Sequence, residues 1–516
     1  MALFRRFATV SGYTGLSRVL GLVRDILFAR FLGAEDIADV FFVAFRLPNM
    51  FRRIFAEGAF NAAFVPLFAR RMEEDGEALA KAFAEQALAV LLAALLALTA
   101  VAIAAMPWLM YVLAWGFDVK PEKFDLAVEL TRITFPYLLF ISLAALLGGV
   151  LNALYRFAAA AAAPLLLNIF FIAALAVLVP LSGQPGHVLA WTVALAGIAQ
   201  CLLLVIASRR AGMRLRLVRP RLTPGVRGLW RLMVPGILSA GVLQLNLVIT
   251  NLIASFEPGA VSKLYYADRL YQLPLGLIGI GLGVVLLPEL SRKLRRGARQ
   301  EAMASLNRGL ELAMLFTVPA TVALLLIPWP IVVVLYERGA FDRATSDATA
   351  LAVAAFAAGL PAYVLMKIFQ PGFFAQEDTV TPLKISVVSI AVTVVFAVVL
   401  FFQFDLGVAG LALATAIGAW VNVTLLVVGL RRREFLDLDR RNRRRLPRIV
   451  LASLIMGAAL WYLQSALAGW FDLGLWAGIA GLGILVGGGV AAYGAAALAL
   501  GAVRLSDMKL ALGRGS

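Results

Sequence analysis

Charged side chains occur inside stretches of this sequence that are otherwise apolar. The stretch near residues 8–32 contains Arg18, Arg24 and Asp25. Arg18 and Asp25 are seven residues apart, so on a helix they share one face. Arginine at such positions can bind an anion, because its planar guanidinium stays charged and donates paired hydrogen bonds.

The next apolar stretch, near residues 37–68, carries a longer polar row. Its polar side chains fall within an arc of about 140° around a helix, which is a single face. The row consists of Asp39, Arg46, Asn49, Arg52, Arg53 and Glu57. Pro48 lies within this row and is expected to bend the helix. Such a helix is expected to turn its polar face towards water or other polar groups, and not towards lipid.

A third polar group, Asp268, Arg269 and Gln272, lies in the stretch near residues 264–290. One ionised side chain at the centre of a bilayer costs about 2.5–3.5 kcal/mol. The charged residues of all three stretches must therefore line a water-filled cavity or pair with one another. The pairs within reach along the sequence are Arg24–Asp25, Arg53–Glu57 and Asp268–Arg269. Such pairing leaves arginine in surplus, which favours a cavity that takes up an anion such as a phosphate.

The composition places these charges in a membrane protein. Of the 516 residues, 62% are hydrophobic and 15% are charged, and the mean hydropathy is +0.90. Soluble domains average about 45–50% apolar residues, so an ordinary soluble chain and a disordered chain are both excluded. The apolar runs are continuous, which excludes the alternating strands of an outer-membrane barrel.

Few residues are available for catalysis or metal binding. The single Cys201 and the single His187 exclude a disulfide within the chain and leave no His/Cys metal site. No phosphate-binding loop of the Gly-x-x-x-x-Gly-Lys type occurs, so we expect the chain not to hydrolyse ATP itself. We expect no enzyme, no cofactor and no metal site. The candidate energy sources are a coupling ion, either sodium or a proton, and the membrane potential.

The apolar stretches predict about 14 membrane-spanning helices. Their expected ranges are 8–32, 37–68, 81–106, 126–154, 160–181, 187–208, 230–255, 264–290, 302–328, 347–372, 380–402, 407–430, 448–468 and 474–502. Alternate connections are strongly basic, with eight arginines in 209–231 and nine in 431–448. Basic loops stay in the cytoplasm, so we expect both termini to be cytoplasmic.

Segments of the first half recur weakly in the second half. Pro66, at the end of the second expected span, recurs as Pro288, and Pro136 of the fourth recurs as Pro361 of the tenth. The repeat is six spans long, an even number, which predicts a pseudo-two-fold axis along the membrane normal. We therefore expect an all-α polytopic membrane protein. It has an N-terminal lobe of six helices at 1–210, a C-terminal lobe of six at 222–433 and two extra helices at 446–504.

Several longer motifs carry a family resemblance. They are SRVLGLVRD at 17–25, ADVFFVAFRLPN at 38–49, EGAFNAAFVP at 57–66, YADRL at 266–270, ERGAF at 337–341 and FAQEDTVTP at 374–382. With these motifs in this order, the chain resembles the MurJ-type (MviN-like) lipid II flippases of the MOP exporter superfamily. The resemblance covers nearly the whole chain.

The resemblance implies a substrate, a location and site residues. The substrate is lipid II, an undecaprenyl-pyrophosphate-linked disaccharide-pentapeptide. It moves by alternating access from the cytoplasmic to the periplasmic leaflet of the bacterial inner membrane. By resemblance, the arginines of the cationic cavity are Arg18, Arg24, Arg52 and Arg269, with Asp39 as the acid that matters for transport. The last two helices at 446–504 form a groove for the lipid tail.

The other polar residues of the three stretches complete the predicted site. We expect Asn49 to contact the substrate beside the arginines. Residues expected to gate or support transport are Asp25, Asp39, Arg53, Glu57, Asp268 and Gln272. The expected partners are lipid II, membrane lipids and other cell-wall synthesis proteins, with no nucleic acid, and the expected state is a monomer.

Other functions remain open at this stage. A multidrug exporter of the same superfamily is disfavoured by a cavity rich in arginine, since those exporters usually take cationic drugs. An exporter of another polyprenyl-linked oligosaccharide would need the same cationic cavity. A membrane glycosyltransferase would also need a catalytic acid and a sizeable external loop, whereas the longest external segment here is about 107–125. The mass of the lipid before and after transport would separate an enzyme from a flippase.

Overall fold

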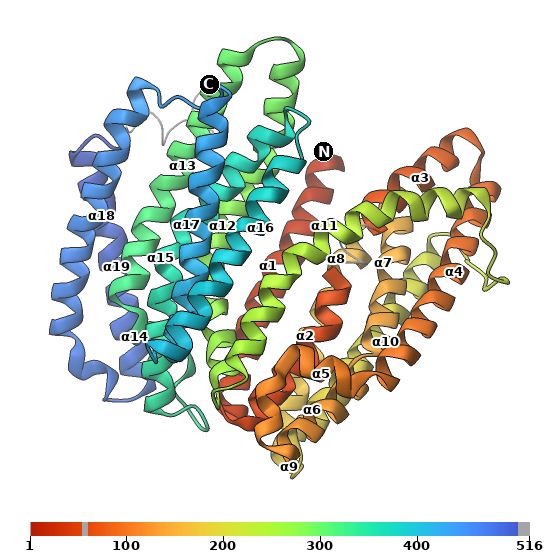
Figure 1. The fold of residues 1–516 in the computed structure, drawn as a ribbon, viewed down its shortest axis with the longest axis horizontal. Coiled ribbons are helices and arrows are strands. Elements are labelled where there is room, and N and C mark those ends of the chain that lie inside the picture. Colours follow the sequence, from red (N-terminus) through yellow and green to blue (C-terminus); the bar gives the residue numbers. More distant parts are fainter. Residues whose placement is uncertain (1, 54–59, 504–516) are drawn as a thin grey trace. The chain divides into compact units, whose positions relative to one another are not determined.

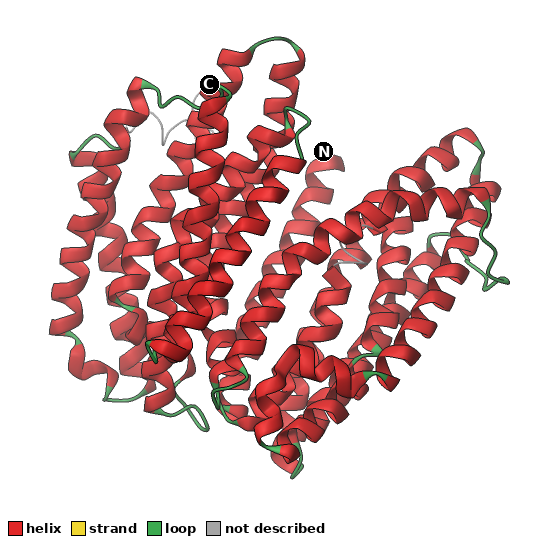
Figure 2. Cartoon of the chain, in the orientation of Figure 1, coloured by secondary structure: helices red, strands yellow, loops and turns green. Residues whose placement is uncertain are grey.

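The computed structural model describes residues 2–53 and 60–503, and every regular element in these ranges is a helix (Figures 1 and 2). Glu57 lies outside the described residues. Ten helices in the described part are long and apolar enough to cross a membrane. The other four expected spans correspond to α1, α2 with α3, α11 and α12, and three of these carry the charged groups. The all-helical class is thus confirmed, while the count of fourteen stays a prediction.

The chain packs into two units, Met1–Ser262 and Lys263–Ser516. The helices up to the boundary are α1 (Ala2–Leu32), α2 (Asp36–Phe51), α3 (Asn61–Glu74), α4 (Glu77–Ala104), α5 (Met106–Ala114), α6 (Pro121–Thr134), α7 (Tyr137–Ala153), α8 (Phe157–Ala173), α9 (Val179–Leu181), α10 (Pro185–Arg210) and α11 (Pro224–Ala254). The second unit holds most of α12 (Ala260–Arg295), then α13 (Arg299–Leu326), α14 (Pro328–Tyr336), α15 (Arg343–Phe374), α16 (Val380–Val398), α17 (Gly407–Arg432), α18 (Arg440–Ala466) and α19 (Leu475–Ala499).

Each unit contains a helix of nine residues that directly follows a helix of 28 residues. In the first unit α5 lies between α4 and α6, and in the second unit α14 lies between α13 and α15. Each short helix has a proline, Pro107 or Pro328, in its first turn. Proline suits that position because its fixed φ is helical and the N–H it lacks would have no partner there. These two short helices were not predicted, although the proline in each was a sequence feature that could have indicated the start of a helix.

Helix α11 packs with the first unit. Asn251 donates to the carbonyl oxygen of Leu113 at 2.9 Å, and the amide of Gly116 donates to the hydroxyl of Ser255 at 2.9 Å. A Cβ at Gly116 would lie 2.4 Å from the backbone of Ser255, so only glycine permits this approach. Packing therefore divides the chain at 262. The predicted lobes at 1–210, 222–433 and 446–504 follow the sequence repeat instead, and they stay a prediction.

An aromatic core holds the charged helices of the first unit. Phe28 of α1 and Phe41 of α2 have ring centroids 5.5 Å apart, and Phe171 of α8 lies 5.2 Å from Phe28. All three side chains are fully buried. Aromatic pairs at this spacing add about 0.5–1.5 kcal/mol beyond the burial of their area. The polar face of α2 is thus set by the phenylalanines on its other face.

The last two helices belong to the core of the second unit. One hydrophobic cluster contains Ile327, which directly precedes α14, and Val334 of α14. It also contains Met456 and Leu460 of α18 and Leu485 of α19. Figure 1 shows α18 and α19 next to α13 and α14. Helices α18 and α19, which were expected as an appendage, therefore pack on the helices of their own unit.

Candidate functional site

Asp39 is a fully buried carboxylate at the start of α2. It accepts hydrogen bonds from the amides of Gly259 and Ser262 at 2.8 and 2.9 Å, and from the Ser262 hydroxyl at 2.8 Å. The ammonium of Lys123 on α6 donates to it at 3.0 Å. Since α12 begins at Ala260, Asp39 satisfies amides that the start of α12 leaves without helical partners. One carboxylate thus joins α2, α6 and the beginning of α12.

Lys123 is the buried counter-charge of this junction. Its ammonium also donates to Asp36 at 2.7 Å, and Lys120 donates to the other oxygen of Asp36 at 2.8 Å. A buried ammonium is tolerated because two carboxylates surround it. Lys123 was not predicted as a site residue, since it lies in a stretch that reads as a connecting segment.

Arg24 and Asp25 form the buried pair that the sequence left open. The Arg24 guanidinium donates to Asp25 at 2.8 and 3.0 Å and to the Asn168 side chain of α8 at 2.9 Å. Arg24 is 7% exposed and Asp25 is 4% exposed. Asn168 also donates to the carbonyl oxygen of Ser17 at 3.1 Å. Arg24 is therefore held in place by α8. Asn168 was not predicted as its partner, although a single amide side chain within an apolar helix was a sequence feature that could have indicated it.

Arg18 differs from Arg24 in its surroundings. It is exposed, and it makes no hydrogen bond or ion pair with the residues that the structure describes. Directly after α2, Arg52 donates to Asn49 at 3.1 Å and Arg53 is exposed. Arg46 donates to Asn251 of α11 at 2.6 Å. Within the first unit, the predicted residues are thus joined as Arg24 with Asp25 and Arg52 with Asn49, while Arg18 offers an unengaged guanidinium.

The predicted residues of the second unit lie on α12. Gln272 donates to Asp268 one helical turn earlier, and the Arg269 guanidinium stacks on Tyr265 with its carbon 4.7 Å from the ring centroid. The neighbouring Tyr266 is fully buried, and its ring centroid lies 5.2 Å from that of Tyr336. This aromatic contact fixes the turn of α12 that carries Asp268 and Arg269.

The motif at 374–382 shapes the connection from α15 to α16. Asp378 accepts from the amides of Val380 and Thr381 at 3.0 and 2.9 Å, and Arg433 at the end of α17 donates to it. Hydrogen bonds from Thr381, helped by Arg433, lower the pKa of Asp378 to about 2. Glu377 adopts a left-handed conformation with φ of 61°. In the described part, this motif caps a helix and ties α16 to α17.

A buried ionic cluster joins α13 to α18, and it was not predicted. Glu311 is 6% exposed and accepts from Arg441 at 3.0 Å and also from Arg308 and Arg445. Asp439 caps α18 by accepting from the Asn442 amide at 2.7 Å. The basic segment around 431–448 thus has a packing role.

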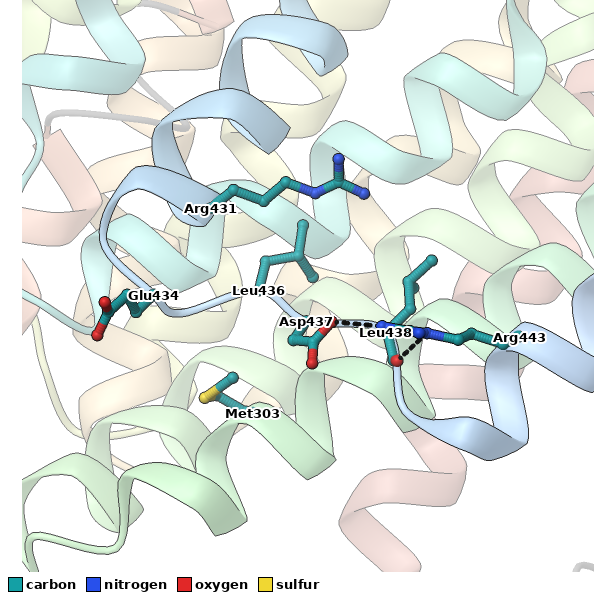
Figure 3. A pocket seen from close by; sticks show the side chains of 7 residues that line it. All are labelled: Met303, Arg431, Glu434, Leu436, Asp437, Leu438 and Arg443. Carbon is teal, nitrogen blue, oxygen red and sulfur yellow. Dashed lines mark hydrogen bonds and ion pairs between the residues drawn. The ribbon is translucent and has the colours of Figure 1, made fainter.

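One cavity of about 610 Å³ lies where α17, α18 and α13 meet at the basic end of the second unit (Figure 3). Its walls include Arg431 and Arg443 but also Glu434 and Asp437, and Arg443 donates to Asp437 at 3.1 Å. Carboxylates in the wall repel an anion, so this cavity does not suit a pyrophosphate.

Among residues 2–53 and 60–503, no three His, Cys, Asp or Glu side chains gather as metal ligands.

The sequence of this chain is similar to known proteins over most of its length. The family model described as lipid II flippase MurJ matches residues 28–479. A probable lipid II flippase MurJ from Rhizobium tropici is 45% identical over 468 residues, covering 90% of this chain and 87% of the relative. The lipid II flippase MurJ of Burkholderia cenocepacia is 41% identical over 438 residues, with 84% of each chain covered.

Solved structures agree with the fold. A lipid II flippase MurJ in an inward closed conformation has a TM-score of 0.71 at 25% identity, covering 92% of this chain and 97% of that one. An inward-facing multidrug resistance MATE family transporter of the MOP superfamily has a TM-score of 0.69 at 18% identity, covering 81% and 94%. The second likeness concerns the fold alone.

Proposed function

This chain belongs to the MurJ family of lipid II flippases, and we propose that a set of arginines including the exposed Arg18 receives the pyrophosphate of lipid II. As a member of this family, it is a multi-pass transporter of the bacterial inner membrane. The transport is directed from the cytoplasmic to the periplasmic leaflet and requires no chemical change in the lipid. A single chain carries it out.

The observation that carries this proposal is the state of Arg18. Its guanidinium is exposed and has no partner among the described residues, although it belongs to an apolar helix. A charged group at membrane depth is retained where it meets a counter-charge or water. A pyrophosphate supplies that counter-charge, and guanidinium groups bind phosphate oxygens in pairs.

The remaining predicted residues take different parts in the proposal. Arg52, which donates to Asn49, is the second proposed ligand, and Arg269 is proposed as a further ligand on the family resemblance alone. Arg24 is already engaged by Asp25, so it joins only when the pyrophosphate displaces one of its present acceptors. The site is thus loaded in order, with Arg18 and Arg52 first and Arg24 after exchange.

Alternating access and the membrane potential complete the proposed cycle. Binding of the pyrophosphate neutralises the arginines and favours the outward-open form. The potential is worth about 2.3 kcal/mol per charge per 100 mV. With a negative interior, it drives the bound anion outward and returns the empty cationic site inward. A coupling ion is not needed for this directionality.

The polyprenyl tail stays on an apolar surface in this scheme. The faces of α18 and α19 that point away from the core expose Leu454, Ile455, Val486 and Val490. A hydrocarbon chain loses nothing by lying against such side chains, whereas the sugars and peptide need a hydrated path. The two last helices are therefore the proposed tail groove.

Flipping of labelled lipid II by purified protein in vesicles tests the proposal. Arg18→Gln removes charged hydrogen bonds worth about 1.5–3 kcal/mol, which predicts a rate lower by roughly 10- to 100-fold. Arg30→Gln is the matched control, because Arg30 is also exposed on α1 but lies in its last turn. A wild-type rate for inserted Arg18→Gln would overturn the pyrophosphate assignment. A change in the mass of the lipid would instead identify an enzyme.

A further inference from the structure

A second cavity, of about 470 Å³, lies in the first unit at the connection between α7 and α8. Its walls come from α1, α7, α8 and α10. Two arginines line it, Arg156 and Arg210, and no acidic residue does. Both arginines are exposed, and their side chains make no hydrogen bond or ion pair with the residues that the structure describes. The cavity therefore has an uncompensated positive charge.

The rest of the cavity wall is apolar. It includes Leu151, Phe157, Leu203 and Ile206. Beneath it, α7, α8 and α10 pack through a small core, so the wall is part of a rigid bundle. A cavity of this size with a few polar groups suits a small organic ligand. The combination of two cations with an apolar wall indicates a ligand that is anionic at one end and hydrocarbon at the other.

A track of exposed apolar side chains leads away from the cavity along α10. Ile206 lies in the cavity wall, and Leu202 and Ile198 follow at four-residue spacing, which places all three on one face of the helix. They are 42%, 55% and 43% exposed. Such a row in a spanning helix faces lipid chains. An acyl chain can follow it while its headgroup stays between the two arginines.

Tyr155 adds a third feature to the mouth of this cavity. It follows the end of α7 and has a φ of 59°, a left-handed conformation that glycine normally adopts just after a helix. The turn is closed by the Arg156 amide donating to Leu151 at 2.8 Å. The Tyr155 ring is 65% exposed and lines the cavity. A tyrosine kept where glycine is favoured suits an interfacial ring beside a headgroup.

From these features we propose that the cavity binds the phosphate of an anionic diacyl phospholipid of the cytoplasmic leaflet. Arg156 and Arg210 hold the phosphate, Tyr155 covers the glycerol region, and one acyl chain follows α10. This inference rests on the proposed membrane topology, which places the basic end of α10 in the cytoplasm. It concerns a site separate from Arg18 and Arg52, so the two proposals can fail independently.

Native mass spectrometry of the full chain in detergent tests the proposal, with phosphatidylglycerol and phosphatidylcholine offered in equal amounts. The wild-type protein is expected to retain phosphatidylglycerol in preference. Each arginine contributes on the order of 5-fold in affinity for an anionic lipid, so the double variant Arg156→Gln/Arg210→Gln should lose roughly 25-fold. Arg209→Gln is the matched control, because this exposed neighbour does not line the cavity.

Several results would overturn the proposal. One is equal retention of the two lipids, and another is unchanged phosphatidylglycerol binding in the double variant. Full displacement by millimolar inorganic phosphate would identify a free anion as the ligand, and preferential displacement by undecaprenyl phosphate would identify a polyprenyl lipid. If the double variant is poorly folded, Tyr155→Gly serves instead, since glycine suits the turn and should lower only lipid binding. Lipid II flipping by the same variants is measured in parallel, so that an effect on phospholipid binding is distinguished from an effect on transport.

Discussion

The junction around Asp39 allows a quantitative test of how the first unit holds the start of α12. Asp39→Asn preserves the shape of the side chain but removes its charge, and one of its two oxygens becomes an amide that faces donors. Lys123 then loses a buried counter-charge. Breaking a buried ion pair in this way costs about 3–5 kcal/mol, which is consistent with losing two hydrogen bonds to a charged acceptor at about 1.5–3 kcal/mol each.

Hydrogen exchange of the amides that donate to Asp39 measures this cost directly. Opening of the junction exposes the Gly259 and Ser262 amides, so their protection should fall by at least roughly 100-fold, since every 1.36 kcal/mol is tenfold. Asp36→Asn is the matched control, because Asp36 binds the lysines but accepts from no amide of α12. Unchanged protection of Gly259 and Ser262 in Asp39→Asn would refute the view that this carboxylate secures the start of α12.

Three further changes test the second unit. Gly359→Val should lower the midpoint of thermal unfolding by a cost of about 1–3 kcal/mol, because a Cβ there would lie 2.8 Å from Ala416 on α17; an unchanged midpoint would mean that α15 and α17 separate easily. Glu311→Gln should cost about 3–5 kcal/mol by removing the buried carboxylate that accepts from Arg441 and Arg445, seen as faster hydrogen exchange at the start of α18; wild-type exchange there would contradict this role. Hydrogen bonds from Thr381 lower the pKa of Asp378 from 3.8 to about 2, so this carboxylate stabilises the α15–α16 connection above about pH 4 and loses that effect as the pH falls towards 2. In the wild type, hydrogen exchange of the α15–α16 connection should become faster as the pH falls from about 4 towards 2, and in Asp378→Asn it should not show this dependence on pH. Identical pH profiles for the two proteins would exclude Asp378 as the titrating group.

Much of the fold was predictable because membrane helices are dominated by one requirement. Their backbone must satisfy its own hydrogen bonds, so a run of about 20 apolar residues can only be a helix. The expected span at 407–430, for example, corresponds to α17, which covers Gly407–Arg432. The stretch at 37–68 corresponds to α2, which ends at Phe51, and α3, which begins at Asn61.

The candidate site was less predictable, because charge in a sequence does not show which partner satisfies it. Arg24 and Arg18 look equivalent along α1, six residues apart. Only packing against α8 brings Asn168 to Arg24 and leaves Arg18 exposed. Lys123 is another example, since nothing near it in sequence marks it as the counter-charge of Asp39.

The sequence by itself determined the membrane class, the helices and the surplus of arginine, because these follow from local hydrophobicity and from composition. Its motifs also identified the family. Tertiary structure decided which charged side chains pair with other residues of the protein, as Arg24 does, and which remain exposed, as Arg18 does. It also decided that Arg156 and Arg210 share one cavity, although 54 positions separate them in the chain. The reason is physical: hydrophobic burial acts on each helix along its own length, whereas the pairing of polar groups depends on side chains that only folding brings within hydrogen-bond distance.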